Sequence, residues 1–493
     1  MVQVSEREPD QDELREQRRR KLQRFQDRGT DLYPHTFHRS HTAAAALAAF
    51  DTLAEQPISV AGRIVAWRSM GKVLFGHIQD GTGRIQLYFR RDDLGTDTFD
   101  ALRDFDLWDV IGVEGTLFKT RTGEITVHVR AVRLLAKCLE LPPEKFHGLQ
   151  DTEQRYRQRY LDLVANEESR DVFIKRSLIV RSMRRFLDTH DFLEVETPML
   201  QPLYGGAAAR PFQTYHNELE RTLYLRISDE LYLKRLIVGG LEKVYEISKD
   251  FRNEGVSFKH NPEFTMMELY WAYADYHDIM ALTEQMICTI AQEVFGTRLV
   301  TFEGHQVDLT PPWRRLTLRD GLFETAGVDI DVQRDAETLY AQCAERGLTV
   351  QPGLTWSKLI DALHGQYLEP TLIQPTFLID YPWELSPLAK HHRTYPNLVE
   401  RFEPFVAGFE IGNAFTELND PADQRARFLQ QAKDAQAGDD EAHPLDEDYL
   451  TALSYGMPPT GGLGIGIDRL TMLLTNRQTI REVILFPALR NVR

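Results

Sequence analysis

Cysteine is scarce in this chain of 493 residues. The three cysteines, Cys138, Cys288 and Cys343, lie far apart and form none of the short spacings that bind zinc. A small, odd and scattered set is typical of a reducing compartment and argues against a secreted domain held by disulfides. The cysteine pattern therefore predicts a cytoplasmic protein.

Long apolar runs are missing as well. No stretch approaches the ~18 apolar residues that a membrane-spanning helix needs, and the polar N-terminus does not resemble a signal peptide. The composition, 42% hydrophobic and 27% charged, is that of a globular protein. We expect a soluble protein of two or three domains, without a membrane partner.

The chain also lacks an excess of positive charge, since its formal net charge is −16. This argues against a protein that coats nucleic acid and requires any such partner to meet a local basic patch. Residues 11–28 predict a helix with several cationic side chains and a thin apolar stripe. The helix is either simply solvated or contacts backbone phosphates, and residues 1–56 are interpreted as a basic helical extension.

The usual nucleotide-binding loops are absent. No P-loop occurs, and the alternating glycines of 461–466 do not match the dinucleotide pattern GxGxxG. Asp468 can cap the helix predicted after these glycines, which places Arg469 at the helix end that favours phosphates. Any ATP site must therefore be of another kind.

The densest set of candidate site residues lies between Lys243 and Tyr276. Strand formers at 243–251 and 263–273 flank a polar loop, which predicts an antiparallel hairpin. Alternation along the second strand puts Phe264, Met266, Glu268 and Tyr270 on one face, and Thr265, Met267, Leu269 and Trp271 on the other. The first face suits a binding floor. Arg252 could reach it and hold a phosphate or carboxylate with two parallel bonds.

The alternative is an amphipathic hairpin whose charges are solvated. Against it, five charged or titratable side chains crowd twelve residues beside Phe264: Arg252, Glu254, Lys259, His260 and Glu263. The runs FRNEG and KHNPEFTMMELYWAYADY resemble the second signature motif of class II aminoacyl-tRNA synthetases, in the lysyl form of subclass IIb and of bacterial type. Val172–His190 with DFLEVETPML resembles the first motif, and residues 461–469 resemble the third.

Residues 58–137 contain five short strand-like runs, which predict a small barrel such as an OB-fold. Its core would hold Leu74, Ile78, Ile85, Leu87 and Phe89. Such a barrel is either a generic interaction module or a platform that stacks single-stranded bases. The run VAGRIVAWRSMGKVLFGHIQDGTGRIQLYF is similar to the anticodon-binding barrel of the class IIb enzymes, which puts Arg68, Phe75, Gln86 and Glu124 at anticodon-contacting positions.

The resemblance covers about 57–493 and implies an α+β chain. We expect an OB-fold at 57–145, a linker at 146–165, and a catalytic domain at 166–493 built on a mainly antiparallel sheet flanked by helices. A helical insertion is expected at about 305–370. In the family the first motif forms a homodimer interface, so a homodimer is implied.

The resemblance also implies the site. Arg252, Arg469 and Glu254 would be catalytic. ATP would contact Arg252, Glu254, Lys259, His260, Asn261, Phe264 and Arg469. Lysine would contact Gly206, Glu230, Glu268, Tyr270, Asn413 and Glu417. Mg²⁺ would be held by Glu403 and Glu410, on either side of a turn near Ala407-Gly408.

The implied reaction activates L-lysine with ATP, releases pyrophosphate, and transfers lysine from the adenylate to the 3′-terminal ribose of tRNA(Lys). An acidic pocket would favour a cationic side chain and repel aspartate, which argues against the aspartyl and asparaginyl enzymes. Two alternatives stay open: a catalytically weak regulator that binds RNA or protein, and a relative that lysylates a protein.

Overall fold

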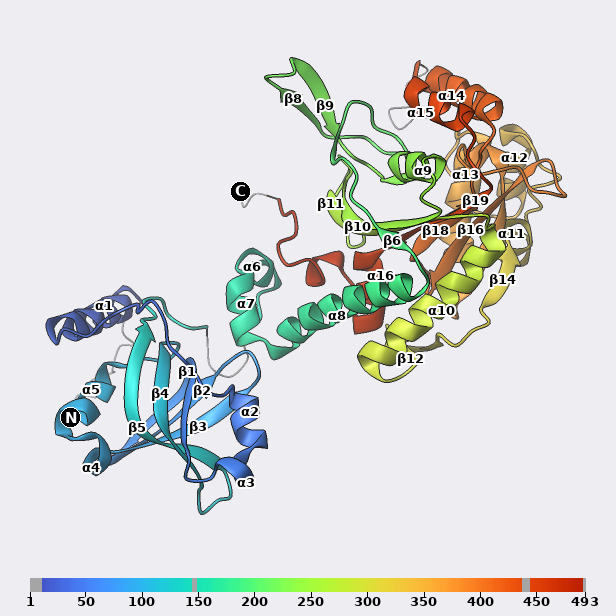
Figure 1. The fold of residues 1–493 in the computed structure, drawn as a ribbon. Coiled ribbons are helices and arrows are strands. Elements are labelled where there is room, and N and C mark those ends of the chain that lie inside the picture. Colours follow the sequence, from blue (N-terminus) through green and yellow to red (C-terminus); the bar gives the residue numbers. More distant parts are fainter. Residues whose placement is uncertain (1–10, 144–148, 437–443, 491–493) are drawn as a thin grey trace, which may run out of the picture. The chain divides into compact units, whose positions relative to one another are not determined.

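The computed structural model describes residues 11–143, 149–436 and 444–490. The chain divides into two compact units, 1–148 and 149–493, which are described separately (Figure 1). Within the described residues, every helix is too short or too polar to cross a bilayer.

The first unit is a closed five-stranded barrel, which confirms the predicted fold of this region. Its strands are β1 (Pro57–Met70), β2 (Val73–Gln79), β3 (Arg84–Arg90), β4 (Val110–Lys119) and β5 (Ile125–Ala136), in the order β1-β2-β3-β5-β4. Inward residues alternate with outward ones along β2 and β3, so that Leu74, Ile78, Ile85, Leu87 and Phe89 are all buried as predicted. Trp67 packs edge-on against Phe89, and its indole N–H donates to the carbonyl of Leu102.

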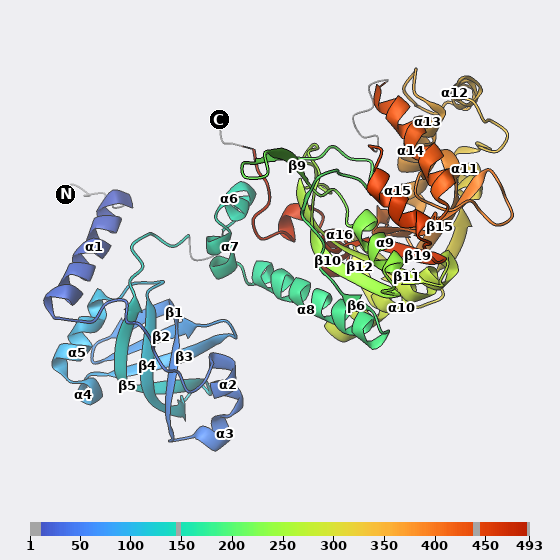
Figure 2. The same ribbon diagram turned by 45° about the horizontal axis from the view of Figure 1, so that its top comes forward.

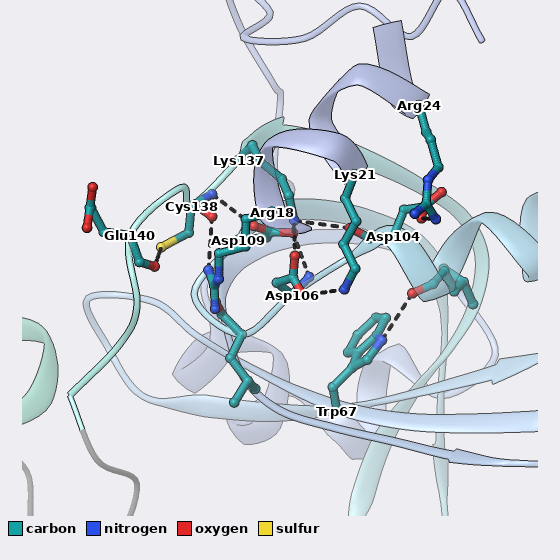
Figure 3. Close-up of polar contacts among 12 residues, drawn as sticks. Arg18, Lys21, Arg24, Trp67, Asp104, Asp106, Asp109, Lys137, Cys138 and Glu140 are labelled. Carbon is teal, nitrogen blue, oxygen red and sulfur yellow. Dashed lines mark hydrogen bonds and ion pairs between the residues drawn. The ribbon is translucent and has the colours of Figure 1, made fainter. Parts of the chain in front are cut away.

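Short helices surround the barrel: α1 (Gln11–Asp27), α2 (Ala43–Ala48), α3 (Phe50–Leu53), α4 (Arg91–Leu94) and α5 (Thr96–Ala101). The predicted basic helix is α1, and ion pairs dock it on the barrel unit (Figure 3). Lys21 lies 2.6 Å from Asp106, and Arg24 lies 2.7 Å from buried Asp104. Arg18 is buried and donates to the carbonyl of Cys138 at 2.9 Å. Arg18 and Lys21 are therefore held within the unit, whereas Arg19, Arg20 and Arg24 keep more than half of their side chains exposed.

The second unit is organised by a nine-stranded sheet, in which β17 pairs only with β16. Its strands are β6 (Leu193–Glu194), β10 (Lys243–Phe251), β11 (Glu263–Ala272), β14 (Arg314–Thr317), β15 (Thr376–Pro382), β16 (Leu398–Val406), β17 (Phe409–Glu410), β18 (Gly412–Thr416) and β19 (Thr460–Gly466). The order is β14-β15-β16-β18-β19-β11-β10-β6, and only the β10–β6 and β14–β15 pairs are parallel. The predicted, mainly antiparallel sheet is confirmed.

Three helices cover one face of this sheet: α8 (Glu167–Thr189), α10 (Tyr276–Phe295) and α16 (Ile467–Thr475) (Figure 2). Met267 and Leu269 of β11 point into that core with Ile465 of β19. The alternation read from the sequence is therefore correct, and it leaves Glu268 and Tyr270 on the opposite face.

The remaining elements surround the sheet, some beside the helices of the first face and others on the second face. Two small sheets are formed by β7 (Leu200–Gln201), β8 (Gln213–His216) and β9 (Arg221–Leu225), and by β12 (Leu299–Phe302) and β13 (His305–Asp308). The other helices are α6 (Thr152–Arg157), α7 (Arg159–Ala165), α9 (Glu230–Val238), α11 (Leu318–Ala326), α12 (Ala336–Glu345), α13 (Trp356–Leu363), α14 (Pro421–Gln436) and α15 (Glu447–Ser454).

Two expected segments differ in detail. The region expected as an insertion holds the helices α11, α12 and α13, but β13 and β14 also lie within it. Residues 146–148 of the expected linker lie outside the described part of the chain, and 152–165 form α6 and α7 of the second unit.

Candidate active site

The face of β11, β10 and β19 that lies opposite the α8, α10 and α16 core forms the floor of the site. Glu268 pairs across to Glu246 of β10 and to Gly464 of β19, while Tyr270 lies opposite Gly462. A Cβ atom at Gly462 would lie 2.0 Å from Oε1 of Glu417 and 2.6 Å from the Tyr270 ring. The alternating glycines of β19 therefore leave room for a carboxylate and a phenol rather than for a dinucleotide.

A buried pair of carboxylates stands at one end of the floor. Glu230 begins α9, and Glu417 follows β18; their side chains meet around the ammonium of Lys234. The Lys234 nitrogen lies 2.5 Å from Oε1 of Glu230 and contacts Oε2 of Glu417. All three side chains are almost fully buried, a position that charged groups occupy only when they are paired.

Neither oxygen of the Glu417 carboxylate accepts a hydrogen bond within the described residues, and only Oε2 has an ion-pair contact, with Lys234. Oε1 of Glu417 is buried and has no hydrogen-bond partner among the described residues. Burial and the neighbouring Glu230 raise the pKa of the Glu417 carboxyl to about 8, against the opposing effect of Lys234. A buried acceptor without a donor is costly, so a cationic group placed beside Oε1 would be strongly favoured.

Glu268 is the third carboxylate of the predicted pocket. It accepts from the hydroxyl of Ser228 at 2.8 Å and from the phenol of Tyr270 at 3.3 Å. Burial and the nearby Asp229 raise its pKa well above the usual range. Gly206 lies against the same group, since a Cβ there would be 2.7 Å from Oγ of Ser228 and its φ is +88°. Four predicted lysine contacts, Gly206, Glu230, Glu268 and Tyr270, thus lie together with Glu417.

Acidic groups continue along the same face of the sheet, on β10, around the buried cation of Arg226. Arg226 is fully buried and lies 2.8 Å from Glu246, 3.0 Å from Asp229 and 3.5 Å from Asp250. Burial raises the pKa of Asp229 to about 8 and that of Asp250 to about 6. This end of the site is therefore strongly acidic beyond the predicted residues.

The other end of the floor carries cations. The Arg252 guanidinium lies over the Phe264 ring at 5.1 Å, and Arg469, near the start of α16, lies 2.9 Å from Glu410 and 3.3 Å from the His260 ring. Burial and then Arg469 lower the pKa of His260, which keeps its ring neutral. Lys259 lies 3.8 Å from Glu369, a residue that follows α13. The predicted phosphate-binding cations Arg252, Lys259 and Arg469 all lie near enough to His260 to act on its pKa, which places them at one end of the floor.

Two predicted ATP contacts are placed differently. Asn261 is buried and turned away from this group: its side-chain amide donates to the carbonyl of Glu263, and its oxygen accepts from the Ala488 amide at 3.0 Å. Asn261 therefore holds the C-terminal segment against the hairpin, and the structure gives it no contact with the floor. Glu254 is exposed on the loop beyond Arg252.

The predicted metal carboxylates lie on one face of the sheet. A two-residue turn, with Ala407 at φ +53° and Gly408 at φ +74°, reverses the chain and pairs Glu410 with Phe405, two residues from Glu403. Glu403 accepts from the Tyr381 phenol at 2.7 Å and pairs with Arg401. Although burial opposes it, Arg469 lowers the pKa of Glu410 and keeps that carboxylate ionised.

Two hard oxygen donors next to a phosphate-binding group fit Mg²⁺, which usually completes its shell with phosphate oxygens and water. Within the described residues, no group of three or more acidic, histidine or cysteine ligands could hold a metal alone. The nearby amide of Asn413 accepts from Arg401 at 3.1 Å, which places this predicted lysine contact between the carboxylate pocket and the metal pair.

The barrel presents its own candidate surface. Phe75 lies beside Tyr88, with ring centres 5.1 Å apart, and Arg68 is the cross-strand neighbour of Phe75. Gln86 donates to Glu124 at 2.7 Å, and Glu124 also lies 2.9 Å from His77. The four predicted anticodon contacts therefore lie on one face with aromatic rings suited to stacking.

Several residues of the site were not predicted from the sequence. Lys234 stands one helical turn after Glu230, a spacing that usually marks a surface ion pair, and only the fold shows that it is buried. Arg401, which orients Glu403 and Asn413, lies in the matching strand two residues before Glu403. The contact between Glu369 and Lys259 joins two segments that are distant in the sequence, and no local sequence pattern predicts it.

Comparison with known proteins agrees with this geometry. Residues 151–490 match the family described as tRNA synthetases class II (D, K and N), and residues 58–135 match the OB-fold nucleic acid binding domain. Lysine–tRNA ligase of Roseiflexus castenholzii is 56% identical, over 97% of this chain and 99% of its own length. The ligase of Pelotomaculum thermopropionicum is 53% identical, over 99% and 97%. That of Staphylococcus haemolyticus is 52% identical, over 96% and 97%. The chain therefore belongs to the lysine–tRNA ligases, within the class II tRNA synthetases.

Proposed function

We propose that the protein activates L-lysine with ATP to lysyl-adenylate and pyrophosphate, and then transfers lysine to the 3′-terminal ribose of tRNA(Lys) in the cytoplasm. The unpaired Oε1 of Glu417, buried next to Tyr270 and Lys234, is the observation that carries the choice of amino acid. An ammonium would satisfy this oxygen, whereas a carboxylate would meet like charge.

The amino acid would lie along the floor between the two groups of residues. Glu230 would receive its α-ammonium and Glu417 with Tyr270 its side-chain ammonium, while Gly206, Glu268 and Asn413 line the space between. These placements leave the substrate carboxylate at the Arg252 end. That carboxylate is already a nucleophile at neutral pH, so the protein needs to align it with the α-phosphorus and neutralise developing charge.

ATP would occupy the cationic end. Phe264 would stack on adenine with Arg469 on the other side, and Arg252 would bridge the substrate carboxylate and the α-phosphate. Lys259 and His260 would contact the outer phosphates, with Glu254 at the loop. Lysine at 259 supplies charge without the planar fork of arginine. Glu403 and Glu410 would hold Mg²⁺, which when bound neutralises phosphate charge.

The barrel would recognise the anticodon of tRNA(Lys) through Arg68, Phe75, Gln86 and Glu124. Replacing Phe75 with alanine should weaken tRNA charging on the order of tenfold, because one stacked base contributes ~1–3 kcal/mol. Adenylate formation, measured by pyrophosphate exchange without tRNA, should be unchanged. Tyr33→Ala, another exposed aromatic of the same unit, is the matched control. Equal losses in both steps would refute the assignment.

We also propose a homodimer formed through the first motif. Ile174 and Leu178 of α8 are exposed, although the opposite side of the same helix is buried in the core. Leu193 of β6 and Leu200 of β7 are exposed as well. A helix that is apolar on two sides favours burial against a second copy. A solution mass equal to one chain would contradict this proposal.

The experiment that tests the function is ATP–pyrophosphate exchange against each of the twenty amino acids, without tRNA. We expect exchange with lysine alone. Exchange with aspartate or asparagine would overturn the pocket assignment, and no exchange with any amino acid would favour the regulator that binds RNA or protein.

A further inference from the structure

The ammonium of Lys234 is the group in the pocket that neither catalysis nor substrate contact has used so far. It is fully buried, and it reaches the pocket from α9, which packs on the same face of the sheet as Tyr270. It contacts Oε1 of Glu230 and Oε2 of Glu417, one oxygen of each carboxylate. The second oxygen of Glu417, Oε1, is the unpaired atom. One internal cation therefore holds both carboxylates that we assign to the two ammonium groups of the substrate.

We propose that Lys234 is a positioning residue for amino-acid recognition, which fixes the separation and the orientation of Glu230 and Glu417 so that each presents one oxygen to a ligand with two ammonium groups. This inference rests on the proposed function. Lys234 does not need to touch the substrate. By setting the distance between the two carboxylates, it determines how long a side chain the bound amino acid can have between its two ammonium groups.

The physical reason is charge balance in a buried place. Two carboxylates this close repel each other, and burial alone would leave both protonated. A cation between them favours the ionised forms and holds the two side chains in one arrangement, because removing it leaves charge uncompensated. The remaining groups that face Lys234 are the Tyr270 ring at 5.9 Å and Tyr449 of α15, both of which are neutral at physiological pH because burial raises their pKa.

Loss of the cation should therefore act in two ways. Without Lys234, the pKa values of Glu230 and Glu417 rise further, so ionised carboxylates require a higher pH. Without the shared contact, the two acceptors also lose their fixed separation. Lysine and its shorter homologue ornithine differ by one methylene, and a rigid pair of acceptors discriminates between them better than a loose pair does.

The test compares Lys234→Met with Lys358→Met, the same change at an exposed helical position. Using pyrophosphate exchange, we expect Lys234→Met to raise the KM for lysine on the order of 10²-fold, with the KM for ATP nearly unchanged. Discrimination against ornithine should fall about tenfold, and the pH profile for lysine should shift to higher pH. Lys358→Met should behave like the unaltered protein.

A double variant keeps the proposal testable if Lys234→Met does not fold. Lys234→Met combined with Glu417→Gln removes two opposite buried charges, which proteins tolerate better than the loss of one. If Lys234 acts through Glu417, the double variant should use lysine about as well as Glu417→Gln alone. Losses that multiply, or an unchanged pH profile and ornithine discrimination in Lys234→Met, would overturn the inference. Failure of lysine exchange in the unaltered protein would instead overturn the proposed function.

Discussion

Glutamine in place of Glu417 should reduce lysine-dependent pyrophosphate exchange at least ~10²-fold, because truncating one partner of a buried charge pair costs several kcal/mol. The change keeps the size of the side chain and removes its charge. It leaves the ammonium of Lys234 with Glu230 as its only carboxylate partner, and it deprives the substrate of its proposed acceptor. The loss should fall on the KM for lysine and leave the KM for ATP nearly unchanged.

The Glu417→Gln substitution should also change the pH dependence of lysine binding. The pKa of Glu417 is raised to about 8 from an ordinary 4.5, so the free pocket keeps a proton there at neutral pH. A bound ammonium favours the ionised form, and lysine affinity should therefore rise from pH 6 to pH 8 with release of a proton. In Glu417→Gln this rise should flatten.

The raised pKa of Glu417 also makes the free energy of unfolding depend on pH. The folded pKa lies above the unfolded one, so the contribution of Glu417 to the free energy of unfolding is complete below about pH 4.5 and is lost as the pH rises through about 8. Lysine should offset that loss, which predicts a larger shift of the melting temperature by lysine at pH 8 than at pH 6. Glu447→Gln, on the exposed partner of Arg425, is the control. Unchanged lysine kinetics in Glu417→Gln would contradict the pocket assignment.

Lysine in place of Arg252 should lower the turnover of lysine activation by ~10²–10³-fold, the usual cost of removing one donor from a developing negative charge. The ammonium keeps the positive charge but lacks the fork that can bridge a carboxylate and a phosphate. Because this contact would be strongest in the transition state, the loss should appear in kcat more than in KM.

Arg319→Lys provides the matched control, since Arg319 makes a forked pair with Asp329 on the surface of the same unit. Its exchange rate should be unchanged. If Arg252→Lys raised the KM for ATP without lowering kcat, Arg252 would contribute only to ground-state binding, and the bridging role would be lost.

The hairpin could be predicted in detail because its information is local. Alternation with a period of two separates Met267 and Leu269 from Glu268 and Tyr270, and the structure places the two pairs on opposite faces. The barrel strands could also be predicted from alternation, and so could the turn at Ala407 and Gly408 between the two carboxylates proposed to hold Mg²⁺.

What could not be predicted depends on contacts between distant segments. Two of the α1 cations, Lys21 and Arg24, pair with Asp106 and Asp104, which lie about 80 residues further along the chain. Asn261 sits in the matching motif, yet the C-terminal segment draws its side chain to Ala488. The residues next to these side chains in the sequence give no indication of either set of partners.

The shared contact of Lys234 also bears on how such a pocket can evolve. Converting it to accept a neutral amino acid would require Lys234 and the two carboxylates to change together, because replacing Lys234 alone leaves two buried carboxylates without their cation and replacing both carboxylates leaves a buried cation unpaired. Intermediates along that path would be less active and less stable at once. The buried charge cluster therefore preserves the preference for lysine during evolution, because single substitutions within it are selected against even where they do not touch the substrate.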